Sequence, residues 1–425
     1  MEVKPGYKQT EVGVIPEDWD VKPLHALANI RSGLAKNSNT TVSDPIRVHY
    51  LRVANVQDGF LDLTDMSQIE VSRSDLNRFS VLPGDVLMNE GGDLDKLGRG
   101  SIWRGELQPC IHQNHVFVVR CGSFVSPEYL TIWSSGTKAR RYFLIAGKQT
   151  TNLASINKTS LGELPIVLPA QDEQDAIATA LSDMGVLLDG LDRLIAKKRA
   201  IKQATMQQLL TGQTRLPGFS GEWEMRSLLE IVENQKALFD DGDWVEAEHI
   251  TDEGIRLIQT GNIGIGQFVE KEASKYIYES SFEKLKCKEL NVGDILICRL
   301  AEPAGRACIL PDIGECRIIT SVDVTIFRPH LGAADRNFLI QVFSTDEWFK
   351  MVLDQVGGTT HKRISRGALG KLRVPFPCIK EQQAIAAILT DMDTEITALK
   401  THHTKTRALK QAMMQELLTG RTRLI

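Results

Sequence analysis

The chain has 425 residues and a formal net charge of −4 at pH 7, so it has room for two or three domains but lacks the basic excess typical of DNA-binding domains. No apolar run approaches the roughly 18 residues of a membrane span, and the N-terminus has no apolar segment typical of a signal peptide. The seven scattered cysteines include no CxxC pair, which argues against zinc ribbons and disulfide frameworks and predicts a location in the reducing cytoplasm.

The first predicted element is a globular domain over residues 1–168. Short apolar runs such as His115–Val119 predict strands, and Pro127–Leu130 has the composition of a helix start. This mixture of signals predicts a mixed α/β domain.

Two segments of this domain are candidate DNA contacts. The first segment carries basic residues and amides. It is a candidate because Arg and Lys neutralise phosphates, while Gln and Asn can form hydrogen bonds with adenine. It consists of Lys138, Arg140, Arg141, Lys148, Gln149 and Asn152. The second is the glycine-rich loop Asn89–Arg99, with Lys96 and Arg99 as its candidate contacts. A solvated helix end and a merely soluble loop are the competing interpretations.

A long helix is predicted next, over residues 169–214. Asp172 is a candidate N-cap, and Gly212 stands where a C-terminal cap glycine belongs. Apolar residues follow a heptad repeat for about three heptads and then give way to Lys198 and Lys202. About 40 residues at 1.5 Å each would form a rod of roughly 60 Å.

The second predicted domain covers residues 215–376 and repeats the skeleton of the first. Trp223–Leu228 resembles Trp19–Leu24, and Val292–Leu296 resembles Pro83–Leu87, whereas the loops between such segments diverge. This domain carries most of the acidic excess of the chain. Its candidate DNA contacts correspond in position to those of the first domain and are Arg299, Arg306, His361, Lys362, Arg363 and Arg366.

The last predicted element, residues 377–425, is a second copy of the long helix. Leu369–Leu424 aligns with Leu161–Leu216 without a gap, with about half of the positions identical, which marks an internal repeat. The two helices are expected to form an antiparallel, coiled-coil-like pair with pseudo-twofold symmetry. The linker after the first helix, Thr214–Trp223, resembles the chain's own start, Val14–Trp19, so the architecture is expected to be cyclic.

Three motifs in this order resemble the specificity subunit of type I restriction-modification systems. The first is the strand-proline-helix segment with a Pro-x3-Glu-Gln core, at Leu164–Gln174 and Leu372–Gln382. The second is Gln-x-Leu-Leu-Thr-Gly-x-Thr-Arg-Leu, at Gln207–Leu216 and Gln415–Leu424. The third is the opening Gly13–Trp19.

The resemblance implies a division of labour between the repeated parts. Each globular domain would be a target-recognition domain that binds one half of a bipartite site in double-stranded DNA. The long helices would hold the domains apart and dock two methyltransferase subunits, and two restriction subunits would join them. The recurrent Glu173, Gln174, Glu381 and Gln382 are the candidate docking residues, although helix capping alone would also explain acidic residues in a first turn.

The sequence itself points to no catalytic chemistry. It contains no Asn-Pro-Pro-Tyr-like or Asp-Pro-Pro-Tyr-like tetrapeptide and no phosphate-binding Gly-x4-Gly-Lys-Ser/Thr motif. The pair His402-His403 lacks an obvious third metal ligand, so no metal, cofactor or catalytic residue is predicted. The rival interpretation is a non-catalytic coiled-coil scaffold for protein–protein interaction; a fragment of a fused restriction enzyme fits the clean repeat less well.

Overall fold

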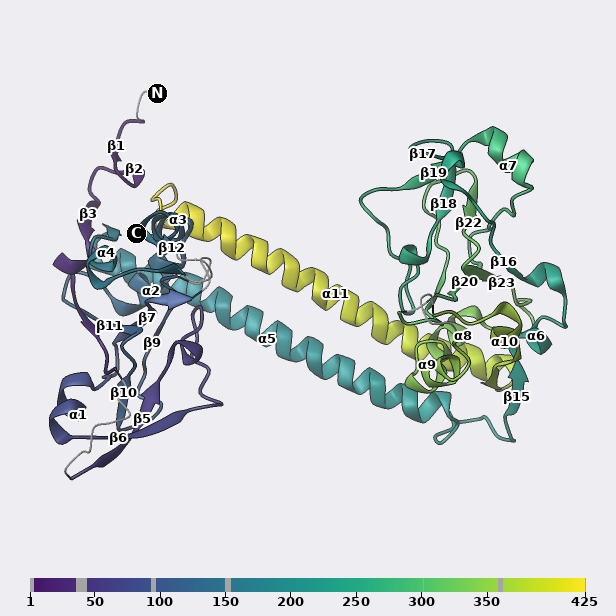
Figure 1. Ribbon diagram of the computed structural model, residues 1–425, viewed down its shortest axis with the longest axis horizontal. Coiled ribbons are helices and arrows are strands. Elements are labelled where there is room, and N and C mark those ends of the chain that lie inside the picture. Colours follow the sequence, from purple (N-terminus) through teal and green to yellow (C-terminus); the bar gives the residue numbers. More distant parts are fainter. Residues whose placement is uncertain are drawn as a thin grey trace. The chain divides into compact units, whose positions relative to one another are not determined.

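The chain folds into two compact units, residues 1–192 with 402–425 and residues 193–401. The computed structural model describes residues 4–35, 44–92, 97–149, 154–300, 302–357 and 362–424 (Figure 1). Each unit contains one mixed α/β domain and part of two long helices, α5 (Gln171–Leu210) and α11 (Ile379–Leu417). The predicted fold class, two mixed α/β domains joined by two long helices, is confirmed.

The first unit is built on a four-stranded antiparallel sheet with the order β4-β11-β7-β9. A second sheet has the order β10-β5-β6, in which β5 and β10 are parallel, and a third small sheet has the order β12-β13-β8. The strands are β1 (Tyr7–Thr10), β2 (Gly13–Pro16), β3 (Asp20–Pro23), β4 (Ala28–Ser32), β5 (Ile46–Leu51), β6 (Ser67–Val71), β7 (Val86–Asn89), β8 (Gly91–Gly92), β9 (Gly100–Ile102), β10 (Cys110–His112), β11 (Val116–Cys121), β12 (Lys148–Gln149), β13 (Ala154–Ser155) and β14 (Pro165–Leu168). The short helices are α1 (Arg73–Phe79), α2 (Pro127–Ser135), α3 (Thr137–Ala146) and α4 (Lys158–Gly162).

The second unit repeats the strand order of the four-stranded sheet and the parallel pair of the second sheet, to which it adds one strand. Its four-stranded sheet has the order β16-β23-β20-β21, and its other large sheet, β17-β19-β18-β22, again contains one parallel pair, β18 with β22. The strands are β15 (Glu224–Ser227), β16 (Phe239–Asp241), β17 (Ile250–Thr251), β18 (Ile255–Ile258), β19 (Lys275–Ile277), β20 (Ile295–Cys298), β21 (Ala307–Ile309), β22 (Ile318–Thr320), β23 (Val324–Phe327) and β24 (Arg373–Phe376). The helices are α6 (Leu228–Ile231), α7 (Glu279–Leu285), α8 (Arg336–Val342), α9 (Asp346–Leu353) and α10 (Arg366–Lys371).

The central strands β7 and β20 show why both halves fold alike. Both are buried along their whole length, and each follows a tight turn in which a glycine has a φ of +91°. The aspartate after that glycine is buried and forms an ion pair with an arginine. Asp85 lies 2.7 Å from Arg120 of the neighbouring strand β11, and Asp294 lies 2.7 Å from Arg328, which directly follows the neighbouring strand β23. Burying such a charge is tolerated only with a close partner, so these pairs fix the turn against the sheet.

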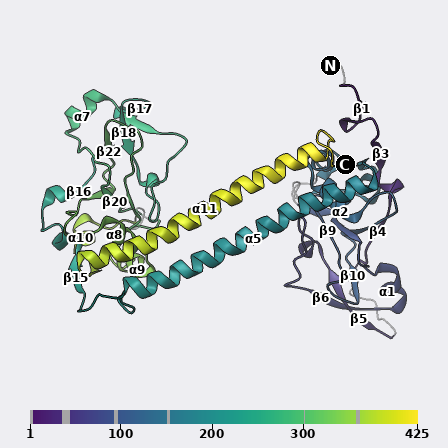
Figure 2. The same cartoon turned by 180° about the vertical axis from the view of Figure 1, so that it is seen from behind.

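The long helices pack against each other in an antiparallel direction within the second unit. Lys198 Nζ lies 2.7 Å from Glu395 Oε1, and Lys202 Nζ lies 2.6 Å from Asp393 Oδ1. Residues later in α5 therefore meet residues earlier in α11. The polar break in the heptad pattern is thus a set of ion pairs across the helix pair. Helix α8 lies against α11 in the same unit (Figure 2).

The first unit has the same antiparallel packing. His403 Nε2 lies 3.4 Å from Asp192 Oδ1, and Thr406 is buried in the helix pair. His403 therefore makes a polar contact across the helix pair. Within the part of the chain that the structure describes, no group of three or more His, Cys, Asp or Glu side chains could hold a metal ion.

The C-terminal segment returns to the first domain and closes the chain in space. The Tyr7 hydroxyl donates to the Gly420 carbonyl at 2.9 Å, and Arg423 donates to both carboxylate oxygens of Asp18 at 3.0 and 2.8 Å. Leu418 is buried in the core of the same unit. The cyclic arrangement expected from the similarity of linker and N-terminus is therefore present in the first unit.

No helix among the described residues is both long enough and apolar enough to span a membrane.

Candidate nucleic-acid interface

The structure brings the two candidate segments of the first domain together. Strand β8, at the start of the glycine-rich loop, pairs with β13, and β13 pairs with β12, which follows the basic helix α3. The register places Gly92 opposite Ala154 and Ala154 opposite Gln149. The ends of both candidate loops therefore lie in one small sheet, although some 60 residues separate them in the sequence.

The second domain makes the corresponding contacts with isolated bridges. Arg363 bridges to Leu300 on one side and to Gly357 on the other. These positions correspond to β13, β8 and β12 of the first domain, because Ile364 donates its N–H to Arg299 as Ile156 does to Glu90. Each domain therefore presents the ends of the same two loops side by side.

Four of the candidate contacts belong to the loops themselves. Lys96, Asn152 and His361 lie outside the described residues, and only the backbone of Gln149 is described. Their part in DNA binding stays a prediction.

The described basic residues of the first domain differ in how available they are. Arg141 and Lys148 are exposed, and their charged groups have no hydrogen bond or ion pair within the described residues. Arg140 Nη2 lies 2.5 Å from Asp58 Oδ2, and Arg99 Nη1 lies 3.5 Å from Gln57 Oε1. Arg141 and Lys148 are thus the strongest phosphate-binding candidates of this domain.

Lys138 has an internal role instead. Its ammonium donates to the Val12 carbonyl, and burial lowers the pKa of this lysine below its ordinary value. This contact attaches α3 to the turn between β1 and β2. The sequence-based expectation that Lys138 contacts DNA therefore has no support from its position.

Among the described candidates of the second domain, one exposed cation has no partner. Lys362 is exposed and has no partner among the described residues. Arg363 is also exposed but lies 3.2 Å from Asp323 Oδ1. Arg306 donates to the Glu302 carbonyl at 2.5 Å. Lys362 and Arg363 are the members of this set that project to solvent.

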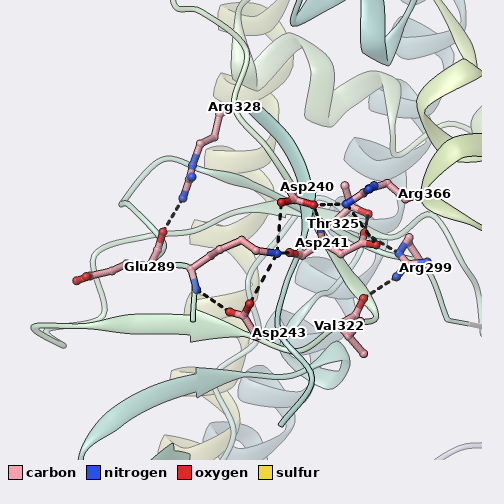
Figure 3. A network of polar contacts seen from close by, with 10 residues as sticks. Asp240, Asp241, Asp243, Glu289, Arg299, Val322, Thr325, Arg328 and Arg366 are labelled. Atoms are coloured by element: carbon pink, nitrogen blue, oxygen red, sulfur yellow. Dashed lines mark hydrogen bonds and ion pairs between the residues drawn. The ribbon is translucent and has the colours of Figure 1, made fainter. Parts of the chain in front are cut away.

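Arg299 and Arg366 belong to an internal network around β16, shown in Figure 3. Arg299 is 1% exposed and donates to the carbonyls of Ile364 at 3.2 Å and Val322 at 2.6 Å. Its Nε lies 3.1 Å from Asp241 Oδ1, and burial lowers the pKa of its guanidinium. The position of Arg299 corrects the expectation of a DNA contact. This side chain is buried and connects the ends of the two loops to the sheet.

The acidic residues of this network are also paired internally. Arg366 forms an ion pair with Asp240, and Lys288 donates its backbone N–H to Asp243 at 2.7 Å. Burial raises the pKa of Asp243. Part of the acidic excess of the second domain is therefore balanced within the domain rather than displayed to a partner.

The four candidate docking residues are buried at the starts of the long helices. Glu173 accepts from Arg423 at 2.7 and 2.8 Å and from Trp19 Nε1 at 3.1 Å. Glu381 accepts in the same way from an arginine and a tryptophan of its own unit, Arg215 at 2.7 Å and Trp223 at 3.1 Å.

Gln174 and Gln382 have equally internal contacts. Gln174 accepts from the Ser126 N–H at 3.1 Å, and Gln382 accepts from the Asp335 N–H at 2.9 Å, which are the N-cap residues of α2 and α8. All four Glu and Gln side chains are at most 5% exposed. Their positions explain the recurrent Glu-Gln motif by contacts within the chain, not by a surface for a partner.

Comparison with known proteins supports the resemblance seen in the sequence. A family model described as "Type I restriction modification DNA specificity domain" matches residues 220–409. The MjaX type I restriction enzyme specificity subunit of Methanocaldococcus jannaschii is 25% identical over 98% of this chain and 96% of its own length. The MjaVIII specificity subunit of the same organism is 23% identical over 96% of this chain and 94% of its own length.

The chain is similar over nearly its whole length to specificity subunits of type I restriction-modification systems. The resemblance carried by the three sequence motifs is confirmed. The family fold agrees as well: the S subunit from M. genitalium has a TM-score of 0.58 at 13% identity, over 98% of each chain. A chain from a solved structure of a type I R-M system also has a TM-score of 0.58, at 16% identity over 96% of this chain and 99% of that one.

The sequence analysis does not predict the ion pairs that hold the turns before β7 and β20. The ion pairs of Asp85 and Asp294 were not anticipated, although the Gly-Asp dipeptide recurs in both domains at the start of a buried strand. An aspartate that recurs beside an apolar strand, with an arginine at a matching interval, could have indicated them. The pairing of β8 with β13 had no sequence signal, since both strands have only two residues.

Proposed function

We propose that this chain is the DNA-recognition subunit of a type I restriction-modification complex and binds a bipartite target in double-stranded DNA. Residues 1–168 and 215–376 would be the two target-recognition domains, and residues 169–214 and 377–425 the spacer helices. One observation carries the proposal. Both domains present the same two loops from the same small strand contacts, while the residues of those loops differ. Two domains with the same scaffold but different loop residues suit the recognition of two different half-sites.

Exposed cations beside these loops support contact with the DNA backbone. Arg141 and Lys148 in the first domain and Lys362 and Arg363 in the second are available to phosphate oxygens. Among the described candidates only these four are exposed in this way, and the net charge of the chain is −4. We therefore expect the isolated chain to bind DNA weakly and to bind tightly when methyltransferase subunits add their own contacts.

The proposed partners are two methyltransferase subunits and two restriction subunits, with the chemistry residing in them. This chain would contribute no catalytic group, metal or cofactor. We also propose that it acts in the cytoplasm, where seven free cysteines would stay reduced.

The half-site assignment is tested by exchanging one domain. Replacing Leu24–Leu153 with the corresponding segment of another specificity subunit should change one half of the methylated site and leave the other half unchanged. The measurement is methylated-base mapping of DNA exposed to the reconstituted complex. A change in both halves would contradict the modular assignment.

The spacer assignment is tested by shortening both long helices by one turn, about 5.4 Å. The number of unspecified base pairs between the half-sites should then change, and a series of duplexes with different spacers measures it. Binding to random-sequence duplex at low and high salt provides the control, because contacts to phosphates weaken steeply with salt. Full affinity for the original spacer after shortening would refute the spacer role, and an absence of DNA binding with methyltransferase present would favour a protein scaffold.

A further inference from the structure

A carboxylate of the second unit neutralises a lysine between α5 and α11. Both carboxylate oxygens of Asp393 accept from Lys202 Nζ, at 2.6 and 2.7 Å. The same carboxylate accepts from Gln341 Nε2 of α8 at 2.9 Å. The Lys202 side chain is 17% exposed, so its charge is both covered and balanced within the unit.

The first unit has the same lysine but lacks the carboxylate. In the alignment of the two repeats, Lys410 corresponds to Lys202 and Gly185 corresponds to Asp393. A Cβ atom added to Gly185 would lie 3.1 Å from Lys410 Nζ, so the lysine faces the position from which a side chain is missing. Lys410 has no hydrogen bond or ion pair within the described residues.

The glutamine that assists Asp393 is replaced as well. The N-cap residues Ser126 of α2 and Asp335 of α8 donate their backbone N–H to equivalent glutamines of the long helices, so α2 and α8 begin at equivalent places. The sixth residue after each N-cap is Ile132 in the first unit and Gln341 in the second. Asp393 and Gln341 of the second unit are thus replaced by Gly185 and Ile132 in the first unit, and only the lysine is kept.

These replacements leave an open groove in the first unit. The groove has a volume of about 480 Å³ and lies between α2, α5 and α11, with β9 and the turn at Asp58 on its rim. Val186, on one wall, is 66% exposed. The apolar side chains that line it are Ile102, Ile132, Leu181, Val186 and Met414.

The charges in the groove leave Lys410 unbalanced. Asp58 and Glu128 on the rim are each paired with an arginine, at 2.5 and 3.6 Å, and Asp189 also has a partner. The carboxylates are therefore engaged, whereas the ammonium is not. A partly covered ammonium beside an apolar wall favours an occupant that supplies both a carboxylate and apolar contacts.

We propose that this groove docks a segment of a methyltransferase subunit that places an Asp or Glu side chain on Lys410. The incoming carboxylate takes the position that Asp393 occupies for Lys202 in the second unit, so the chain itself shows the geometry of the bound state. This inference rests on the proposed function, since it names the contact made by a partner of that complex. It also means that the two halves of the helix pair offer unequal surfaces to the two methyltransferase subunits.

The test introduces a carboxylate into the groove by substitution of Gly185. The variant Gly185→Asp supplies the missing carboxylate, and Gly185→Ala is the matched control, because it makes the same backbone change without the charge. Gly185 has no positive φ, and its only close neighbour is the flexible end of Lys410. Both variants remove a helix glycine, so both should melt no lower than the wild type, with a gain for alanine of roughly 2–4 °C.

Binding of the methyltransferase subunit is measured by titration calorimetry and by native mass spectrometry of the full complex. Gly185→Asp should weaken one of the two binding events by about tenfold or more and leave the other unchanged, whereas Gly185→Ala should bind like the wild type. Lys410→Met should weaken the same event, and this effect should shrink at high salt.

Two different failures are distinguishable. If the wild type binds methyltransferase and Gly185→Asp binds it equally well at both events, the docking inference is wrong and the proposed function stands. If the wild type binds no methyltransferase in the presence of DNA, the proposed function fails and the inference fails with it.

Discussion

Arg423→Ala should open the closed chain at its C-terminal end. Glu173 is 5% exposed and accepts two charge-assisted hydrogen bonds from Arg423, at 2.7 and 2.8 Å. Without the arginine, this carboxylate keeps only the Trp19 N–H, at 3.1 Å. The C-terminal segment also loses its bidentate contact with Asp18.

The expected loss of unfolding free energy is about 3 kcal/mol. Removing one partner of a buried ion pair costs roughly 3–5 kcal/mol. The lower end applies here because the Arg423 side chain is 25% exposed, so water can reach the vacated site. In a folding unit of 150–250 residues this loss corresponds to a decrease in Tm of about 6–12 °C.

Differential scanning calorimetry and limited proteolysis measure this effect. We expect a lower Tm for the first unit and faster cleavage after Leu418 in Arg423→Ala. Arg215→Ala is the matched control, because Arg215 donates to Glu381 and lies over the Trp223 ring, as Arg423 does with Glu173 and Trp19, but Arg215 lies within a continuous linker. Its chain cannot separate as a free end, so proteolysis should increase less.

The difference between wild type and Arg423→Ala should also depend on pH. The hydrogen bond from Arg423 lowers the pKa of Asp18 below its ordinary value. A lowered carboxylate pKa contributes stability above the unfolded-state pKa, and this contribution is lost as the pH falls through the folded-state pKa. The Tm difference should therefore narrow below about pH 4. An Arg423→Ala protein that melts within about 1 °C of wild type at pH 7 would refute the reasoning.

Three further predictions concern single side chains. Burial lowers the pKa of His112 to about 4. Acidification from pH 7.5 to 5 should therefore lower the unfolding free energy by about 2 kcal/mol more in wild type than in His112→Thr, a variant that carries the residue found at the same place in the second domain. Equal pH profiles of the two proteins in urea titrations would contradict this. In a thiol titration of native protein, the exposed Cys316 and Cys378 should react quickly and the other five cysteines slowly, and a third fast thiol would show that the core is more open than described. Gly420→Ala should destabilise the protein more than Gly212→Ala, because both glycines have positive φ but only at Gly420 would a Cβ approach the proline at the end of β2 to 2.4 Å; similar Tm values for the two variants would count against the closed chain.

Much of the architecture could be predicted from repetition in the sequence. The ungapped match of Leu161–Leu216 with Leu369–Leu424 predicts two equivalent helices, and a heptad pattern with ends capped by glycine predicts their length. Gly212 and Gly420 have φ values of +71° and +66°, as cap glycines require. Such features are local, since a helix depends on residues three or four positions apart.

The candidate DNA interface could be predicted only in outline. The two predicted segments of each domain lie side by side, but within them Arg299 is buried and Lys138 is bound to a backbone carbonyl, while Arg141 and Lys148 are exposed. Composition cannot separate a lysine that contacts solvent from one that contacts the chain. That difference depends on which distant segment packs beside the residue.

The sequence by itself determined the resemblance to specificity subunits, the two-domain organisation and the polar break of the helices, because repeats, caps and heptads depend on neighbouring residues. Tertiary structure alone decided what each charged residue of the repeat does. Lys202 and Lys410 occupy the same position in the repeat, yet Lys202 meets Asp393 and Lys410 faces Gly185. The antiparallel packing places each lysine opposite the other copy of the helix, so its partner is set by a residue some 190 or more positions away. The physical reason is that an ion pair needs two groups within about 4 Å, and only the folded chain brings these groups that close.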